Sequence, residues 1–421
     1  MFSDSIHLAD QLDLPAFVTM FWHMLVFEVP RFLIAIFVIG ATEAFRRAEP
    51  QPDPVRPLSL SVLMPGHNEG ASLRQTVIGL RDQTRSITQV VVVDDGSTDD
   101  MMSVGQQLKS EGLIDVFVAT GLRGGKSAAA NLGLTYCTGD IVIIADIDTS
   151  FDRDALEKVT EPFQDPRVGA VAGNLAVRNP NASVIAKFQA IQYLLSISLG
   201  RRVTDMLDIV FIVSGAFGAF RREALMSVGG WEVGPGEDAD ITVKLRRTGW
   251  KIRFQPNAWA LTDVPDTVLA LVRQRLRWNR TLVRVRVRKF ARMFDTSRHN
   301  FSAADALGTL DIIYFQAILP ASFFVYIVWL FAHFGTFAWV ILGVVTIVYM
   351  TSALISFLIA ASVSDHYGRL GLLLYVPGYA LFNAYVLRAI AVYAYLDELI
   401  FRRSYKDTYV PSRVLNQAED F

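Results

Sequence analysis

The chain contains two patterns of hydrophobic and polar residues. Between residues 58 and 148, short runs rich in valine and isoleucine alternate with stretches whose apolar residues recur every three or four positions. The first pattern is typical of buried strands and the second of amphipathic helices. In chain order the pattern predicts strand 58–65, helix 71–83, strand 89–96, helix 99–112, strand 114–120, helix 125–136 and strand 140–148. This alternation predicts an α/β domain whose mostly parallel sheet is covered by helices.

Longer apolar runs lie on both sides of this region. A helix needs about 20 apolar residues to cross a bilayer. Three runs of suitable length follow residue 305 and span 312–331, 337–363 and 370–400. An earlier run, 15–40, is interrupted by polar residues, and we predict that it is a membrane anchor. It does not fit a cleavable signal peptide, because residues 1–14 hold three aspartates and no lysine or arginine.

The charges that flank the first run predict its orientation. Acids precede it and Arg46 and Arg47 follow it, so we expect the N-terminus outside and the chain from residue 46 onward in the cytosol. The closing tail is also basic and should be cytosolic, whereas one anchor plus three spans would place it outside. Either the third run enters and leaves on one side, or part of it is an interfacial helix, or the charge rule fails here. The predicted divisions are an anchor at 1–47, a cytosolic domain at 48–262, interfacial helices at 263–305, transmembrane helices at 306–401 and a basic tail at 402–421.

Composition narrows the classes of function. Hydrophobic residues make up 52% of the 421 residues, which is high for a soluble protein. The 40 basic and 41 acidic residues give a net charge of −1, so the molecule as a whole is not a polyanion binder, and we expect no nucleic acid partner. Its single cysteine, Cys137, excludes an intramolecular disulfide and a multi-cysteine zinc site.

Acidic residues gather where predicted strands end, which is where parallel sheets bind ligands. Asp146 and Asp148 lie two residues apart, so they share one face of an extended chain and can address one Mg²⁺ or Mn²⁺ ion. The alternative is a solvated turn. Asp94 and Asp95 end the second strand and can accept hydrogen bonds from a nucleobase or a ribose, although a turn that caps the next helix explains them as well.

Two further motifs are candidates for chemistry. "RGGK" opens a predicted helix, but position 120 holds threonine where the phosphate-loop spacing requires glycine. Lys126 and the nearby backbone N–H groups can still bind a diphosphate. Glu237 and Asp238 precede another helical pattern, where they either interact with the helix dipole or, in a polar cleft, supply a general base.

The stretch 273–292 is strongly basic. At its head, Gln274, Arg277 and Trp278 suit a sugar ring stacked on an indole with a guanidinium bound to a diphosphate. We expect most of 280–292 to lie on the cytosolic membrane face, where arginines meet lipid phosphates.

These motifs occur in one order, DDG, DxD, an acid-Asp pair and QxxRW, between membrane runs. In that order they strongly resemble the processive family 2 glycosyltransferases, the cellulose, chitin, hyaluronan and poly-N-acetylglucosamine synthases. The phrases "EPFQDPRVGAVAGN", "VSGAFGAFRREAL", "GEDADITVKL" and "RQRLRW" are most similar to bacterial poly-β-1,6-N-acetylglucosamine synthases. The resemblance implies a GT-A type nucleotide-sugar-binding domain inserted between transmembrane helices. It also implies a multi-pass protein of the bacterial inner membrane with its catalytic domain in the cytosol.

The implied activity is that of an inverting hexosyltransferase. It would polymerise a β-linked polysaccharide from a UDP-sugar, with UDP-N-acetylglucosamine favoured, and pass the chain across the membrane. A UDP-glucose-dependent β-glucan synthase and a non-processive glycolipid glycosyltransferase remain alternatives. The implied partners are the UDP-sugar, the growing polysaccharide and the lipid bilayer, and the resemblance allows a small membrane or periplasmic export partner.

The resemblance also implies roles for single residues. Asp95, together with Asp94, would hold the uridine, and Asp146 and Asp148 would bind the sugar nucleotide and its metal. In the acid pair, Asp238 would be the general base. The residues that would bind the diphosphate and the acceptor end are Gln274, Arg275, Arg277 and Trp278, and the segment that would line the acceptor site is 214–220. In this chain Gly236 replaces the threonine that usually precedes the acid pair.

Overall fold

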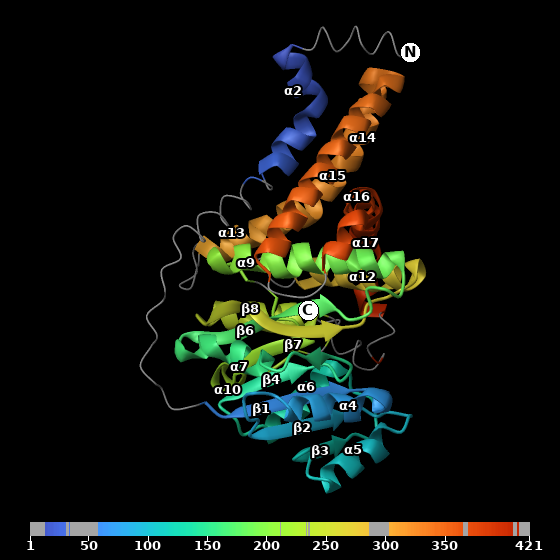
Figure 1. Cartoon of the computed structure of the whole chain (residues 1–421). Helices are drawn as coiled ribbons and strands as arrows, with labels where there is room; N and C mark the ends of the chain where they lie inside the picture. Colours follow the sequence, from blue (N-terminus) through green and yellow to red (C-terminus); the bar gives the residue numbers. More distant parts are fainter. Residues whose placement is uncertain are drawn as a thin grey trace.

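A computed structural model describes residues 13–30, 33, 58–210, 212–232, 234, 236–285, 303–364, 369–406 and 411. The described residues form an α/β domain and a bundle of apolar helices on one side of it (Figure 1). Residues 34–57, which include the end of the predicted anchor with Arg46 and Arg47, the basic residues 286–292 and the tail beyond 411 lie outside the described residues, so the predictions made for them stay predictions.

The domain is built on one eight-stranded sheet, with strand order β3-β2-β1-β4-β7-β6-β8-β5. Its strands are β1 (Leu60–Gly66), β2 (Gln89–Asp94), β3 (Val116–Ala119), β4 (Ile141–Ala145), β5 (Ser150–Phe151), β6 (Val168–Val177), β7 (Phe217–Arg221) and β8 (Lys251–Thr262). The sheet is mixed. β1 pairs in parallel with β2 and β4, as do β2 with β3 and β6 with β8, whereas β7 is antiparallel to β4 and β6, and β5 to β8. The predicted parallel arrangement therefore holds for β1 to β4, and β7 reverses the direction.

Helices cover both faces of the sheet because successive strand residues point to opposite sides. Val90 and Val92 of β2 pack on one side, and Val91 and Val93 on the other. The first side is covered by α4 (Gly70–Arg81), α5 (Met101–Ser110) and α7 (Ala155–Thr160). The second is covered by α6 (Lys126–Tyr136), α10 (Arg222–Ser227) and α11 (Glu237–Arg247). Two apolar cores thus hold the sheet rigid.

The strand register brings the polar strand ends to one edge. Gly66 of β1 is paired with Asp94 of β2, and Leu63 of β1 with Ile144 of β4. The loops that follow these three strands therefore begin side by side, and they carry the acidic clusters recognised in the sequence.

A layer of helices separates this domain from the bundle (Figure 1). It consists of α8 (Val184–Gln192), which continues through Tyr193–Leu199 into α9 (Gly200–Met206), and of α12 (Val268–Leu282). The bundle contains α2 (Leu14–His23), α13 (Ala303–Ile312), α14 (Leu319–Phe334), α15 (Ala338–Ser362), α16 (Val376–Leu381) and α17 (Arg388–Phe401).

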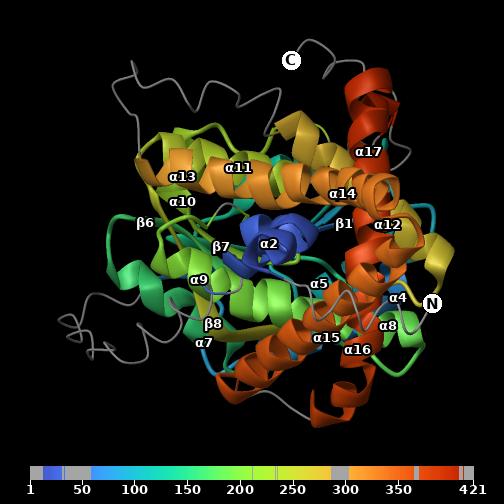
Figure 2. The same ribbon diagram turned by 90° about the horizontal axis from the view of Figure 1, so that it is seen from above.

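Two helical stretches of the described residues, Ala306–Ser362 and Leu370–Phe401, are long and apolar enough to cross a membrane. The first is divided at Gly335, whose φ of 52° lies in the left-handed region, and α15 starts three residues later. Seen from above, α14 and α15 run in different directions from this point (Figure 2). The shorter apolar helix Leu14–Glu28 packs on both of them, and the Tyr326 hydroxyl donates a hydrogen bond to the Met20 carbonyl.

Candidate active site

The Asp94-Asp95 pair at the end of β2 is bonded to the backbone. Asp94 Oδ1 accepts from the Ser97 N–H at 2.8 Å. The two oxygens of Asp95 accept from the N–H groups of Gly124 at 2.6 Å and Gly125 at 2.7 Å. In this arrangement the pair anchors the loop that leads into α6. Its proposed contact with a uridine stays a prediction.

Lys126 begins α6 directly after Gly125, whose φ is 89°. Its ammonium group forms an ion pair with Asp146 in the loop after β4. Burial lowers the pKa of Lys126, but the charges of Asp146 and Glu237 and the hydrogen bond to Asp146 outweigh burial and raise it. The Lys126 ammonium group of α6 therefore interacts with carboxylates from the loop after β4 and from α11.

Glu237 and Asp238 form the first turn of α11. Gly236 before them has a φ of 91°, and a Cβ there would overlap the Thr281 Cγ2 methyl group, so the threonine usual at this position does not fit. Burial raises the pKa of Asp238, and the Ala239 N–H, Lys126 and Arg201 oppose that rise. The pKa of Glu237 is raised by burial and by the Asp238 charge. A carboxylate with a raised pKa is suited to act as a general base near neutral pH.

Arg201 of α9 is a site residue that sequence reasoning missed. Burial lowers its pKa to about 10, while the charges of Asp238 and Tyr193 favour its charged form. Its Nη1 lies 3.5 Å from the Gly173 carbonyl. Asp238 belongs to a different element, and a single arginine in a helix carries no recognisable motif.

Glu69, in the loop after β1, is a second residue that was not predicted. Its Oε2 is buried and has no hydrogen-bond partner among the described residues. Burial, followed by the charges of Asp146 and Asp148, raises the pKa of Glu69 to about 8. The signal was present in the sequence, because "GHNE" is a polar cluster at the end of a predicted strand.

Asp146 and Asp148 were predicted to hold a divalent cation. Burial and the Asp146 charge raise the pKa of Asp148, and the charges of Arg178 and Lys126 oppose that rise. Within the described residues, no group of three or more His, Cys, Asp or Glu side chains could hold a metal ion. Mg²⁺ and Mn²⁺ commonly take one or two carboxylates and complete their coordination with substrate phosphates and water, so Asp146 and Asp148 would suffice as protein ligands. That they hold a metal stays a prediction.

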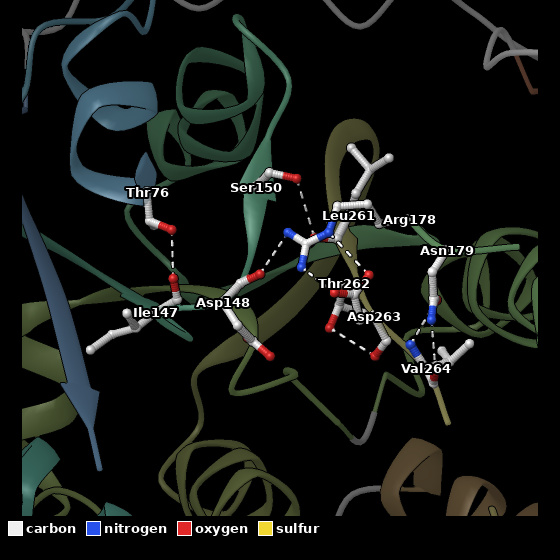
Figure 3. Close-up of polar contacts among 10 residues, drawn as sticks. All are labelled: Thr76, Ile147, Asp148, Ser150, Arg178, Asn179, Leu261, Thr262, Asp263 and Val264. Carbon is white, nitrogen blue, oxygen red and sulfur yellow. Dashed lines mark hydrogen bonds and ion pairs between the residues drawn. The ribbon is translucent and has the colours of Figure 1, made fainter. Parts of the chain in front are cut away.

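The main chain of this loop is held from both sides (Figure 3). The Thr76 hydroxyl donates to the Ile147 carbonyl at 2.5 Å, and Arg178 Nη1 donates to the Asp148 carbonyl at 2.7 Å. These bonds use backbone oxygens and leave the Asp148 carboxylate available.

The QxxRW residues lie on α12. Arg275 is buried, donates to Gln192 Oε1 at 2.7 Å and lies 4.4 Å from the centre of the Trp278 ring. Trp278 is 41% exposed, so its outer face can receive a ligand. Gln274 Oε1 is buried without a hydrogen-bond partner in the described part of the chain, and Arg277 is partly buried on the same helix. Arg275 thus packs against Trp278. The contact of Arg275 with a diphosphate stays a prediction.

The first arginine of the basic stretch 280–292 is bound within the protein. Arg280 Nη2 pairs with Asp397 of α17 at 2.7 Å. Asp397 is buried, so its charge needs a partner within the protein. The prediction that most of 280–292 lies on the membrane face stays a prediction.

The predicted acceptor segment lies beside Lys126. A Cβ on Gly215 would stand 2.9 Å from Lys126 Nζ, so the chain passes directly over the ammonium group. The structure therefore brings together Lys126, Asp146, Glu237, Asp238 and the segment around Gly215, with Glu69 and Asp148 adjacent.

Comparison with known proteins agrees with this geometry. Residues 61–229 match the family model described as "Glycosyl transferase family 2". The matched residues run from β1 to the end of α10, which is most of the α/β domain. Glu237, Asp238 and residues 274–278 follow the matched part of the domain.

Curated proteins similar to this chain include poly-beta-1,6-N-acetyl-D-glucosamine synthases. The poly-beta-1,6-N-acetyl-D-glucosamine synthase of Staphylococcus aureus (strain COL) is 30% identical over 241 residues, 57% of this chain and 58% of that protein. The Staphylococcus epidermidis protein of the same name is 29% identical over 221 residues, 52% of this chain and 53% of that protein. The aligned part thus spans little more than half of each relative.

A solved structure shows the same fold. A mannosyltransferase from Pyrobaculum calidifontis, in complex with GDP-Man and Mn²⁺, superposes with a TM-score of 0.57 at 21% identity and covers 88% of this chain and 99% of that one. The fold of the domain is therefore GT-A-like, as predicted.

Proposed function

We propose that the protein is a membrane-embedded, inverting hexosyltransferase that polymerises a β-linked polysaccharide from a UDP-sugar and passes the chain across the membrane. The name of the curated relatives favours UDP-N-acetylglucosamine as the donor. The observation that carries the proposal is the convergence of Lys126, Asp146 and the Glu237-Asp238 pair at the carboxyl edge of a glycosyltransferase sheet.

In the proposed reaction, Asp238 is the base and UDP is the leaving group. Asp238 accepts the proton of an acceptor hydroxyl, and that oxygen attacks the anomeric carbon of the donor sugar. The bond between this carbon and the β-phosphate oxygen breaks, and UDP leaves with the electron pair. Attack from the face opposite to UDP converts an α-linked donor into a β-linked product, so no enzyme nucleophile is needed.

Negative charge grows on UDP as it leaves, and a cation close to that position stabilises the transition state. Lys126, held by Asp146 beside Asp238, is such a cation. Mg²⁺ or Mn²⁺ bound by Asp146 and Asp148 would supply further neutralisation of the diphosphate. Trp278 offers its exposed face to the acceptor sugar, and Gln274 offers a buried amide oxygen that needs a donor.

The helical bundle supports the membrane assignment. Its helices expose large apolar side chains, among them Val328 (70%), Trp339 (67%) and Leu374 (87%). Many exposed large apolar side chains of this kind are unusual on a soluble protein, and a bilayer would cover them. The bundle lies next to α9 and α12, the helices that carry Arg201 and Trp278 (Figure 1), so a growing chain would have a short path to the membrane.

The proposal is tested by incubating the purified, detergent-solubilised protein with a panel of UDP-sugars and measuring released UDP and product size. We expect UDP release to be greatest with UDP-N-acetylglucosamine, and a polymeric product. Release with UDP-glucose alone would indicate a β-glucan synthase. A single sugar added to a lipid, without polymer, would contradict processive synthesis, and no release with any UDP-sugar would contradict the proposal as a whole.

A further inference from the structure

Arg178 occupies a junction between three parts of the domain (Figure 3). It directly follows β6, and its N–H donates to the Thr262 carbonyl at the end of β8 at 3.0 Å. Its guanidinium donates through Nη1 to the Asp148 carbonyl at 2.7 Å. The same guanidinium binds Asp263 through Nε at 3.1 Å and Nη2 at 2.6 Å. The Arg178 side chain thus joins the loop after β4 that carries Asp146 and Asp148, here called the DxD loop, to the end of β8.

The position of Asp263 is fixed in turn. Val264 and Asn179 exchange two hydrogen bonds of 3.0 Å each, one from the Asn179 amide group to the Val264 carbonyl and one from the Val264 N–H to the Asn179 side chain (Figure 3). The chain then reaches Thr267, whose side chain caps α12. Only three residues separate Asp263 from this cap, so displacement of Asp263 displaces the start of the helix that carries Gln274 and Trp278.

We propose that Arg178 is a positioning residue. It holds the DxD loop at a fixed distance from α12, so that the two carboxylates of the loop and the QxxRW residues of α12 are positioned relative to each other. The inference rests on the proposed function, because it assigns Asp146 and Asp148 to a metal-bound sugar nucleotide. Arg178 binds the loop through a backbone oxygen, so it orients the Asp148 carboxylate without occupying it.

The chemistry of arginine is required for this role. A guanidinium presents its donors in a rigid, planar fork, which here reaches a carboxylate on one side and a carbonyl on the other. Lysine places its charge at a single nitrogen and cannot keep both contacts in this geometry. Arg178→Lys therefore conserves the charge and removes the bridge.

The chain contains a matched control. Near the opposite end of β6, Arg167 binds Asp165 through Nε at 3.0 Å and Nη2 at 2.8 Å, a similar two-point contact at an exposed position. Arg167→Lys breaks that contact without touching the DxD loop. If Arg178 only stabilises the sheet, Arg178→Lys and Arg167→Lys should behave similarly.

The test is UDP binding by the purified full-length protein, measured by calorimetry as a function of Mn²⁺ concentration, with thermal unfolding measured in parallel. For Arg178→Lys we expect the Mn²⁺ concentration for half-maximal UDP binding to rise about 10-fold or more, as is common when groups that orient metal ligands are lost. Saturating Mn²⁺ should restore UDP binding. Asp263→Asn should show the same direction of change, and Arg167→Lys should match the wild type.

Other outcomes overturn the inference. If Arg178→Lys binds UDP with the Mn²⁺ dependence of the wild type, Arg178 does not position the loop. The inference also fails if Arg178→Lys loses UDP binding in proportion to its loss of thermal stability and saturating Mn²⁺ does not restore UDP binding. If the wild type itself does not bind UDP with Mn²⁺, the proposed function fails together with the inference, whereas normal wild-type binding with an unchanged Arg178→Lys variant refutes the inference alone.

Discussion

Lys126 is the residue on which the acids of the candidate site depend. It pairs with Asp146, and its charge lowers the pKa values of Glu237 and Asp238 against the effect of burial. Without this cation, three acids would face each other in a partly buried region, which strongly favours protonation. A lysine that opens α6 therefore controls the protonation of an acid that opens α11.

Lys126→Met should move the acidic limb of the pH profile of kcat/KM to higher pH. Removing the positive charge raises the pKa of Asp238, and because the base acts in its ionised form, less of it is active at any pH below that pKa. If the pKa rises by about one pH unit, the rate in that range falls about tenfold. Lys158→Met, which breaks a surface pair with Asp154, is the control and should leave the profile unchanged. An unaltered profile for Lys126→Met would contradict this account.

Glu69 predicts a pH dependence of stability. Its folded-state pKa of about 8 exceeds the ordinary value of 4.5, so between these values the unfolded chain releases a proton that the folded protein retains. The free energy of unfolding should therefore fall as the pH rises from about 4.5 to about 8 in metal-free buffer. Glu69→Gln should remove this part of the pH dependence. If the free energy of unfolding of the two proteins changes with pH in the same way across that range, the pKa assigned to Glu69 is wrong.

Sequence reasoning at this scale selects residues that share a short motif. Asp146 and Asp148 lie two residues apart, and Glu237 and Asp238 are adjacent, so spacing alone made them candidates, and their roles stay predictions. Arg178 and Arg201 were not found because their partners, Asp263 and Asp238, come from other elements. Only the fold brings such pairs together.

At the scale of elements, α12 connects the site to the bundle. Arg275 binds Gln192 at the end of α8, and two residues after Trp278 Arg280 binds Asp397 of α17. Arg403 also contacts Asp397, with Nε 3.2 Å from Oδ1. The helix that carries the QxxRW motif is thereby held against both the domain and the bundle.

Arg280→Met should weaken this attachment. It removes one of two cations from a buried carboxylate, a change that typically costs about 3 kcal/mol when a buried pair is broken. We expect a lower melting temperature and reduced sugar transfer, both measured on the purified protein. Adding Asp397→Asn should recover part of the melting temperature, because the unpaired charge is then absent. Arg273→Met, at an exposed position of the same helix, should match the wild type; an equal loss in that variant would contradict a specific role of the Arg280 pair.

The elements between residues 58 and 148 could be predicted because each has a clear period. β1, β2 and β4 are continuous apolar runs, and α4, α5 and α6 follow the helical spacing. The antiparallel β7 could not be predicted, because strand direction depends on how the intervening α8 and α9 leave the sheet and return. The Arg280 contact was not predicted, because charge density identifies a basic segment without identifying its partner.

For the whole molecule, the N-terminal helix is joined to the C-terminal helices by a buried ion pair. Arg388 of α17 binds Glu28 at 2.5 Å, and the Tyr349 hydroxyl of α15 donates to the same carboxylate at 3.1 Å. The two charged side chains are 10% and 15% exposed. Segments more than 300 residues apart in the sequence are thus connected within the bundle.

Glu28→Gln should destabilise the bundle, because among the described residues the buried Arg388 charge would keep only the Tyr349 hydroxyl and ring faces as partners. Removing one partner of a buried pair costs about 3–5 kcal/mol. A double-mutant cycle with Arg388→Met, followed by thermal unfolding in detergent, should give a coupling energy well above experimental error. Additive effects of the two substitutions would contradict the pairing.

The most direct test of the central claim is sugar transfer by Asp238→Asn. The substitution keeps the size of the side chain and removes the base, so incorporation of labelled sugar from the preferred UDP-sugar should fall by about 100- to 10,000-fold. UDP binding and the melting temperature should persist. Glu223→Gln, which changes an exposed acid in the first turn of α10, is the control and should retain wild-type transfer. Polymer synthesis by Asp238→Asn at the wild-type rate would contradict the account.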